Sequence, residues 1–418
     1  MTVRASYGIF YDQPSMYQWL WAAVSPPFGT TEVLNNPVGG LSNPYLGVPG
    51  GSPFPVIPTK TAPFPQFSIF TENPLHPQVT YINQWNLSVE RQIGSDWLLR
   101  GSYIGNNTIH LWSVRDVNEP VFLGTGPCTI PGPNGTSTSY PVCSTTANSN
   151  QRRPLYAQNP NQGQYYSNIV LEDQGGTGTF DGLLLSVQRR LSRGITMQSN
   201  YTWSHCISDL PNYQPGVSGP TPTSGSTRRF DRGNCPTTDR RQNFNLSTTV
   251  QTPQLSQRTL RMLASGWKVS GIISAVSAQI FNVTLGVDNA LNNQTGQRPN
   301  VVGNPYPANQ SINNWLNTSS FVTPPVGILG NLGTYNLRGP ALLQFDMSVA
   351  RAFRIREKHT IEFRVEAFNI LNRLNASPPT STTNSGLFGK ITSDVSGSAA
   401  GQQAGDPRIL QVADKYVF

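Results

Sequence analysis

The chain has 418 residues and a formal net charge of +8, with 29 Lys and Arg against 21 Asp and Glu. Charged residues make up 12% of it, about half of the roughly 25% usual in soluble domains, while 10% are aromatic. Disordered chains are usually rich in charge and poor in aromatic residues, so this composition argues against wholesale disorder. The arginines are scattered without a basic stripe or a recognisable nucleic-acid module, so no nucleic-acid partner is predicted.

About ten segments alternate apolar and polar residues or are rich in β-branched and aromatic residues, as strands are. In chain order they lie at about residues 2–12, 80–92, 96–106, 179–192, 194–205, 240–252, 266–284, 343–349, 361–367 and 406–418. The clearest is 361–367, with apolar residues at odd positions and charged residues at even positions. The segment 343–349 alternates in the same way, and the two are predicted to form a hairpin. No run of about 18 apolar residues is present, so a membrane-spanning helix is not expected.

The predicted connections alternate between short and long. Gly94-Ser95-Asp96 and Ser192-Arg193-Gly194 suit hairpin turns, and the link 252–266 is somewhat longer. The long connections, rich in Pro, Gly, Asn, Ser and Thr, cover about 13–79, 107–178, 206–239, 285–340 and 372–405. Short periplasmic turns alternating with long extracellular loops are typical of an outer-membrane barrel. The predicted fold class is therefore all-β, an antiparallel transmembrane β-barrel that is partial because only about ten strands are found.

A strand that faces lipid must satisfy its backbone through its neighbours and exposes an apolar side chain at every second position. On this interpretation the alternating hairpin turns its charged side chains toward the lumen. These residues are Asp346, Glu362, Arg364 and Glu366. They are candidate substrate contacts, or else a solvated and mutually paired wall. The alternative hypothesis is a secreted all-β binding or adhesion module that buries its apolar faces and recognises glycans through exposed aromatic residues.

The four cysteines all fall on the side of the long connections. Cys128 and Cys143 lie in one connection, and Cys206 and Cys235 lie in or at the mouth of another. Two local disulfides are predicted, each stabilising its loop by about 3–4 kcal/mol in the chain-entropy account, which fits a compartment outside the cytosol. A zinc site is less favoured because no close Cys-x-x-Cys pair is present.

No catalytic constellation is visible in the sequence. Four histidines, His76, His110, His205 and His359, lie far apart without metal-ligand spacing. No nucleophile elbow, phosphate-binding loop or paired-carboxylate motif accompanies them. The prediction is therefore a protein that is not an enzyme and that needs no cofactor or metal.

The chain ends in a strand that carries Tyr416 and the terminal Phe418 on one face, interrupted by Asp414. This end is similar to the C-terminal signal of bacterial outer-membrane proteins, which the barrel assembly machinery reads. Both aromatic residues are therefore predicted to act in assembly.

Several short segments, in their order and spacing, carry a family resemblance. They are Tyr7–Asp12, Gln84–Arg91, Tyr201–Ser204, Asp239–Arg241, Gly266–Gly271, Phe363–Asn372 and Gly405–Arg408. With these segments the chain resembles the barrel part of Oar-like TonB-dependent receptors over nearly all of residues 1–418. The resemblance implies a bacterial outer-membrane location, contact with outer-membrane lipid, and energised uptake or surface binding of an unknown substrate.

The same resemblance implies parts that this sequence does not contain. Neither a plug domain nor a carboxypeptidase-regulatory-like domain is found in 1–418, and contact with the TonB complex is expected only through such an N-terminal region. Residues 1–418 are therefore expected to be the C-terminal portion of a longer barrel. The sheet is expected to be open, or loosely closed with its seam between 2–12 and 406–418.

Overall fold

The computed structural model describes most of the chain. The described residues are 1–13, 25–26, 29, 34, 37–48, 50–52, 54–55, 64–210, 228–236, 239–253, 255–356, 359–396 and 406–418.

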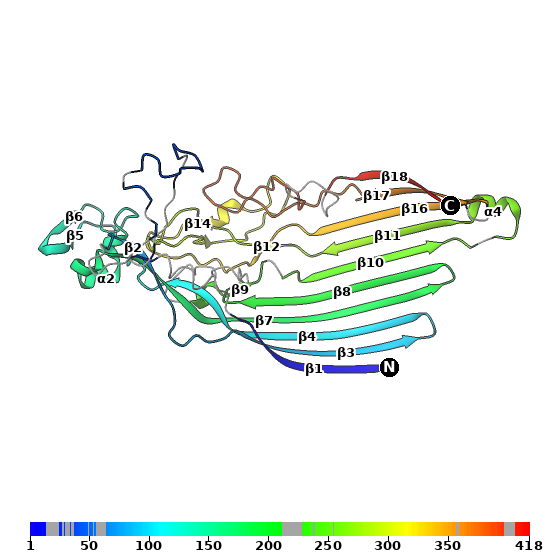
Figure 1. Ribbon diagram of the computed structural model, residues 1–418, viewed down its shortest axis with the longest axis horizontal. Helices are drawn as coiled ribbons and strands as arrows, with labels where there is room; N and C mark the ends of the chain where they lie inside the picture. The colour runs from blue at the N-terminus through cyan, green and yellow to red at the C-terminus, as the bar shows by residue number, and fades with distance from the viewer. Residues whose placement is uncertain are drawn as a thin grey trace.

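The fold is built on one large antiparallel sheet of long strands (Figure 1). Its ten main strands, in pairing order, are β1 (Thr2–Tyr11), β3 (Tyr81–Ile93), β4 (Trp97–Asp116), β7 (Tyr166–Ser192), β8 (Ile195–Ser208), β10 (Gln242–Gln251), β11 (Trp267–Val276), β16 (Leu342–Arg356), β17 (His359–Phe368) and β18 (Ile409–Val417). Consecutive strands of this order are hydrogen-bonded neighbours, so the sheet is an antiparallel meander. The predicted all-β fold with about ten long strands is confirmed.

The remaining elements are short and lie mainly at the end of the sheet that carries the long connections (Figure 1). The short strands are β2 (Ser68–Glu72), β5 (Cys128–Pro131), β6 (Ser137–Tyr140), β9 (Gly233–Asn234), β12 (Ile280–Phe281), β13 (Asn300–Val301), β14 (Phe321–Val322) and β15 (Leu337–Arg338). The helical elements are η1 (Pro133–Gly135), η2 (Asn150–Arg152), α2 (Pro154–Gln158), α3 (Pro160–Gly163), η3 (Arg228–Asp231), α4 (Arg258–Ala264) and η4 (Thr318–Ser320). Within the described residues, no helix combines the length and the apolar character that crossing a membrane requires.

Several predicted boundaries were wrong. The connection placed at 107–178 is much shorter, because β4 continues to Asp116 and β7 begins at Tyr166. These extensions mix apolar residues, such as Leu111, Val114 and Leu171, with polar ones, and their pairing shifts register twice, so no regular alternation marks them. The strand predicted over 266–284 ends at Val276, and the link before it contains α4. The connection at 13–79 contains β2, which pairs in parallel with the outer part of β7.

The cross-strand register divides the sheet into two chemically different faces. Directly opposed residues of neighbouring strands lie on the same face of the sheet. The pairings therefore show, strand by strand from β1 to β18, which alternate residues share one face. One face, called the apolar face here, includes Val3, Tyr7, Ile9, Trp85, Leu87, Val89, Leu99, Tyr103, Leu183, Leu185, Met197, Tyr201, Leu246, Val250, Val269, Ile273, Met347, Val349, Ile361, Phe363, Val365, Leu410, Val412 and Tyr416. The opposite face, called the polar face, includes Arg4, Ser6, Asn86, Ser88, Glu90, Arg100, Ser102, Ser186, Gln188, Gln198, Asn200, Asn245, Ser247, Ser270, Asp346, Ser348, Glu362, Arg364 and Glu366.

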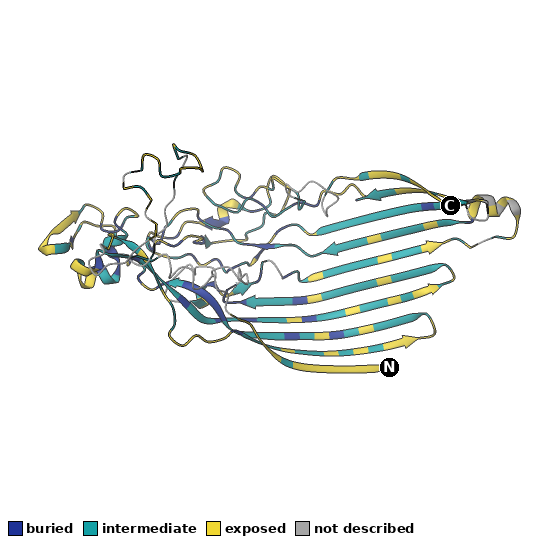
Figure 2. Cartoon of the chain, viewed as in Figure 1, coloured by how far each residue is buried: buried dark blue, intermediate teal, exposed yellow. Residues whose placement is uncertain are grey.

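The apolar face is largely uncovered. Phe363 is 45% exposed, Val412 62% and Tyr7 66%, although these side chains are large and apolar. Figure 2 shows exposed and half-exposed residues along the length of the strands, and buried residues mainly toward the end with the long connections. Contiguous exposed apolar surface spread over ten strands exceeds what a soluble monomer presents.

The strand lengths match a membrane crossing. Five strands, β1, β10, β11, β17 and β18, have nine or ten residues. A tilted transmembrane strand needs about 9–11 residues. The longer β4 and β7, with 20 and 27 residues, therefore project beyond a hydrocarbon core on the side of the long connections.

Aromatic residues mark the end of the apolar face near the short turns. Trp97 begins β4 and Trp267 begins β11. The guanidinium carbon of Arg189 lies 5.3 Å from the ring centroid of Trp97, and that of Arg351 lies 5.0 Å from the ring centroid of Trp267. Aromatic girdles with cationic neighbours are typical of a membrane interface, where ring and charge meet the headgroups.

The two edges of the sheet are formed by β1 and β18. Within the described residues, β1 pairs with β3 and β18 pairs with β17, and the two strands lie on opposite sides of the sheet in Figure 1. Pairing between β1 and β18 is not found among the described residues, which is what the expected open sheet requires.

Candidate functional site

The polar face forms a hollow over the first strands of the sheet. It has a volume of about 790 Å³ and is lined mostly by hydroxyl and amide side chains of β3, β4, β7 and β8. Glu90 accepts hydrogen bonds from Arg100, with Nη2 at 2.7 Å, and Arg4 Nη1 lies 3.5 Å from the same carboxylate oxygen. Hydrogen bonding to Arg100 holds the two strands together across this wall. The hollow is a water-compatible surface rather than a closed pocket.

The predicted lumen-facing charges all lie on the polar face, but their environments differ. Asp346 Oδ1 accepts a hydrogen bond from the backbone N–H of Asn369 at 2.8 Å, so it fixes the bend after β17. Arg364 Nε lies 3.5 Å from Glu366 Oε1 on the same strand. Glu362 stands opposite Lys415 in the β17–β18 register. These contacts fit a mutually paired wall.

Described parts of the long connections fold together into a compact layer, called the loop cap here. It comprises residues 117–165, 228–236, 280–340 and 376–396. Its apolar core consists of Phe281, Val283, Leu316, Phe321, Leu332 and Leu337. Val283 and Leu316 are fully buried, and Phe321 makes an edge-to-face contact with Phe388. The loop cap therefore has a small hydrophobic core of its own.

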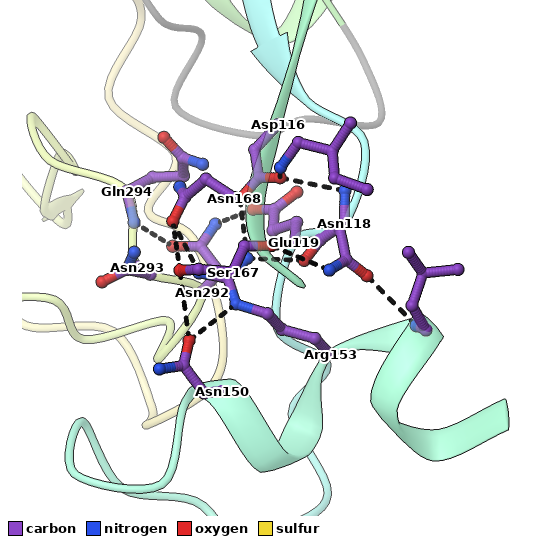
Figure 3. A network of polar contacts seen from close by, with 12 residues as sticks. Asp116, Asn118, Glu119, Asn150, Arg153, Ser167, Asn168, Asn292, Asn293 and Gln294 are labelled. Atoms are coloured by element: carbon purple, nitrogen blue, oxygen red, sulfur yellow. Dashed lines mark hydrogen bonds and ion pairs between the residues drawn. The ribbon is translucent and has the colours of Figure 1, made fainter. Parts of the chain in front are cut away.

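A buried ion pair anchors the loop cap to the outer ends of β4 and β7 (Figure 3). Arg153 Nη1 donates to Asp116 Oδ2 at 2.9 Å, and the two side chains are 1% and 2% exposed. Asp116 Oδ1 also accepts the backbone N–H groups of Asn118 and Ile169, at 2.9 and 3.1 Å. Arg153 further donates to Asn168 Oδ1 at 2.8 Å. Every partner has several hydrogen bonds, which is the condition for tolerating a buried charge pair.

The neighbouring Arg152 joins two segments of the loop cap that are far apart in the sequence. Its guanidinium donates to the carbonyl oxygens of Val121 at 2.6 Å, Thr145 at 3.0 Å and Leu291 at 2.8 Å. Burial lowers the pKa of Arg152, an effect that the nearby Asp288 carboxylate opposes. Arg152 therefore links the segments 117–165 and 280–340, because its guanidinium donates hydrogen bonds to backbone carbonyl oxygens of both.

A second buried arginine connects 228–236 to the same layer. Arg298 Nη1 lies 2.5 Å from Asp231 Oδ1, and its Nε donates to the carbonyl oxygen of Leu332 at 2.8 Å. In the sequence, Arg152 and Arg153 are one of several scattered arginine pairs, and Arg298 stands alone. Nothing local in the sequence marks the acidic partners of Arg153 and Arg298, which lie 37 and 67 residues away.

Both predicted cysteine pairs are bonded in the structure. Cys128 is bonded to Cys143 with a Cα–Cα distance of 5.2 Å, and Cys206 to Cys235 with 5.5 Å. The first disulfide closes the β5–β6 hairpin, and the second joins the outer end of β8 to the segment after β9. Both therefore lie on the side of the long connections. Free cysteines are not found among the described residues, and no described group of His, Cys, Asp or Glu is arranged to hold a metal ion.

Removal of the first disulfide is expected to loosen its hairpin without affecting the sheet. The double variant Cys128→Ser/Cys143→Ser should lose about 3 kcal/mol of local stability, since the closed loop spans 15 residues. Hydrogen–deuterium exchange of peptides from β5 and β6, compared with peptides from β17, measures this. Non-reducing peptide mapping of exported protein checks the pairing, and cross-paired cysteines or four free thiols would contradict it.

The segment Phe363–Asn372, which contributes to the family resemblance, has a structural role at its end. Asn369 adopts a left-handed conformation with φ 48°, which asparagine tolerates better than most residues. Its Nδ2 donates to the carbonyl oxygens of Arg373 and Asp406, both at 2.9 Å. Asn372 Oδ1 accepts the backbone N–H of Arg408 at 3.1 Å. Both asparagines thus join the end of β17 to the chain entering β18.

The predicted C-terminal signal residues lie at the end of the sheet near the short turns. Tyr416 is on the apolar face, stacked on His359 with ring centroids 5.8 Å apart, and Phe418 is 87% exposed. The ring centroids of Tyr416 and Phe418 are 6.0 Å apart. They present an accessible aromatic pair at the outer side of an edge strand.

The family comparison identifies the kind of sheet that this is. The family described as outer membrane beta barrel domain matches residues 1–411. The chain belongs to this family. The barrel domain therefore belongs to the bacterial outer membrane, and its exposed apolar face is expected to meet lipid. This finding does not favour the alternative of a secreted binding module.

Solved structures with similarity to the barrel domain include three outer-membrane proteins. The outer membrane transporter YddB of Escherichia coli is 10% identical, with a TM-score of 0.42, 84% of this chain and 34% of that chain covered. The ferric-catecholate import receptor Fiu of E. coli is 10% identical, with a TM-score of 0.39 and coverages of 99% and 32%. FpvA of P. aeruginosa, solved with pyoverdines, is 11% identical, with a TM-score of 0.37 and coverages of 82% and 28%.

The barrel domain spans about a third of the length of these structures. The search of curated proteins gives no match.

Proposed function

We propose that the barrel domain forms part of a TonB-dependent receptor of the Oar-like kind, which takes up or binds a substrate at the cell surface. The observation that carries this proposal is the combination of a lipid-facing sheet with a polar inner wall and a folded loop cap at one end. A simple membrane anchor does not need a polar inner wall, and the 790 Å³ hollow on the polar face supports a role in binding or passage.

The loop cap supports a receptor more than an open pore. Buried arginines and an apolar core make the outer surface a rigid structure, and rigid elements position binding residues more precisely than mobile loops do. In this proposal the cap receives the substrate, and the polar wall accompanies its passage or supports a further domain. The proposal assigns transport and binding to the barrel domain, and no catalysis.

The test uses the source bacterium, because the substrate is unknown. The gene encoding the barrel domain is deleted in one strain and the gene for TonB in another, and depletion of solutes from a complex medium is followed by mass spectrometry. The proposal predicts at least one solute whose uptake is lost in both strains and restored by complementation. A solute lost in the first strain and taken up normally without TonB would indicate a passive pore and overturn the proposal.

The C-terminal aromatic pair is proposed to serve the barrel assembly machinery. Phe418→Ser should reduce the amount of barrel domain in the outer membrane several-fold, because the recognised edge strand loses its terminal aromatic residue. Immunoblots of membrane fractions measure this, with Val417→Thr as the matched control on the opposite face. Equal amounts of the Phe418→Ser and unmodified proteins in the outer membrane would contradict the role.

A further inference from the structure

A small pocket with a single charge lies beneath the loop cap, at the outer ends of β10, β11 and β16. It has a volume of about 230 Å³. Its lining residues are Arg240, Val276, Gln279, Pro340, Leu342, Ala376, Ser377, Pro378 and Val395. Val276 and Leu342 oppose each other in the β11–β16 register and belong to the polar side of the sheet. Most of the lining is apolar, so the guanidinium of Arg240 is its chemically distinctive group.

The three residues Asp239-Arg240-Arg241, which contribute to the family resemblance, divide their roles here. Asp239 is almost fully buried, lies 3.5 Å from Arg241, and accepts the backbone N–H of Cys206 at 3.3 Å. Asp239 and Arg241 thus neutralise each other and support the base of the disulfide-bonded segment. Arg240 takes no part in that pair.

Arg240 has hydrogen-bonding capacity to spare. Its Nη1 donates to the carbonyl oxygen of Ser277 at 3.4 Å, and its Nη2 donates to Gln279 Oε1 at 3.2 Å. Both contacts are long, and a guanidinium has five N–H donors. Burial lowers the pKa of Arg240, and no charged neighbour contributes to this change. Within the part of the chain that the structure describes, no carboxylate forms an ion pair with this cation.

The nearest acidic residue along the lining segment is already engaged. Asp394 Oδ1 accepts a hydrogen bond from Ser396 Oγ at 2.6 Å, and Asp394 bridges to Ala376 through the backbone. The sequence beyond it, 397–405, contains no Asp or Glu. A partly desolvated cation without a counter-charge is costly, so an anion from outside the chain is the natural partner.

We propose that this pocket binds a small organic anion, with its carboxylate on Arg240 and a compact apolar body against Val276, Leu342 and Val395. The volume corresponds to about eight water molecules at roughly 30 Å³ each and is smaller than the roughly 300–1,000 Å³ of pockets for drug-sized ligands. A planar guanidinium binds a carboxylate through two parallel N–H···O bonds. Gly339 lets the chain approach Pro378 of the pocket wall closely, since a Cβ there would lie 3.2 Å from Pro378 Cα.

The test measures binding to the purified, folded chain in detergent, independently of any uptake. Benzoate is the probe, benzamide is the uncharged match, and inorganic phosphate is an anion without an apolar body. The proposal expects saturable binding of benzoate and at least about tenfold weaker binding of both other compounds, by calorimetry or ligand-observed NMR.

Two independent variants locate the site. Arg240→Gln and the pocket-filling Ala376→Phe should each weaken benzoate binding at least about tenfold, while Arg190→Gln, an exposed arginine near the short turns, should leave it unchanged. Heat-modifiable gel mobility reports whether each variant is folded, and Ala376→Phe decides the question if Arg240→Gln is not. Failure of benzoate to bind, equal binding of benzamide or phosphate, or unchanged binding in a folded pocket variant would overturn the proposal. None of these outcomes bears on TonB-dependent uptake.

Discussion

Removal of either partner of the buried Arg153–Asp116 pair is expected to destabilise the loop cap by about 3–5 kcal/mol, because a charge would remain buried without its counter-charge. The two side chains are at most 2% exposed, so water cannot replace the missing partner without local unfolding. Arg153→Met and Asp116→Ala are the variants. Hydrogen–deuterium exchange in residues 117–165 measures the loss, and exchange in β17 and β18 should remain unchanged.

An exposed ion pair provides the matched control. Arg4 and Glu90 are 3.5 Å apart with Arg4 63% exposed, so Arg4→Met should cost less than about 1 kcal/mol. The combined variant Arg153→Met/Asp116→Leu should recover part of the loss, since it leaves neither charge behind. Equal exchange in Arg153→Met and the unmodified protein would show that the loop cap does not depend on this pair.

Arginine substitution on the apolar face is expected to have the second large effect. Phe363→Arg and Val365→Arg should each destabilise the folded protein by about 2–4 kcal/mol if the site lies near the bilayer midplane, because the charge would enter hydrocarbon. Ile361→Arg should also destabilise the folded protein. Reversible unfolding by urea in lipid vesicles, followed through tryptophan fluorescence, measures the difference.

Neighbouring positions of the same strand serve as controls for that effect. Glu362→Gln and Arg364→Gln face the polar side, so we expect changes of less than about 1 kcal/mol. Arg364 and Glu366 are only 3.5 Å apart and partly exposed, which limits what their removal costs. Similar losses on both faces would mean that β17 does not separate lipid from water.

The fold could be predicted where local patterns determine it. In 361–367 every second residue is apolar, and the structure places Ile361, Phe363 and Val365 on the apolar face as that pattern indicates. The turns at 94–96 and 192–194 contain glycines with positive φ, at Gly94 and Gly194, which local sequence also signals. These features depend on residues adjacent in sequence.

Features that depend on distant partners could not be predicted. The outer parts of β4 and β7 lack a regular alternation of apolar and polar residues, and their strand structure arises from pairing with each other. The core of the loop cap brings Val283 together with Leu316 and Leu337, and no periodicity connects positions so far apart. The helix α4 has a local signal, since Leu260–Ala264 contains mostly good helix formers, although the prediction for 252–266 is only a somewhat longer link.

The candidate site shows the same division. The alternation of apolar and charged residues predicts which charged side chains lie on the polar face. The Asp346–Asn369 contact instead depends on how the chain bends after β17. In the sequence Arg240 is one residue of a family segment, and only the structure distinguishes it from its paired neighbours Asp239 and Arg241.

The central claim, that the two faces of the sheet meet lipid and water, is tested most directly by scanning β17 with single cysteines. Cysteines are introduced one at a time at positions 361 to 366, with the native disulfides intact, and the protein is inserted into vesicles that carry nitroxide-labelled lipid. A fluorophore attached at 361, 363 or 365 should be quenched by the lipid probe. One at 362, 364 or 366 should instead be quenched by aqueous iodide. Equal quenching at odd and even positions would contradict the account.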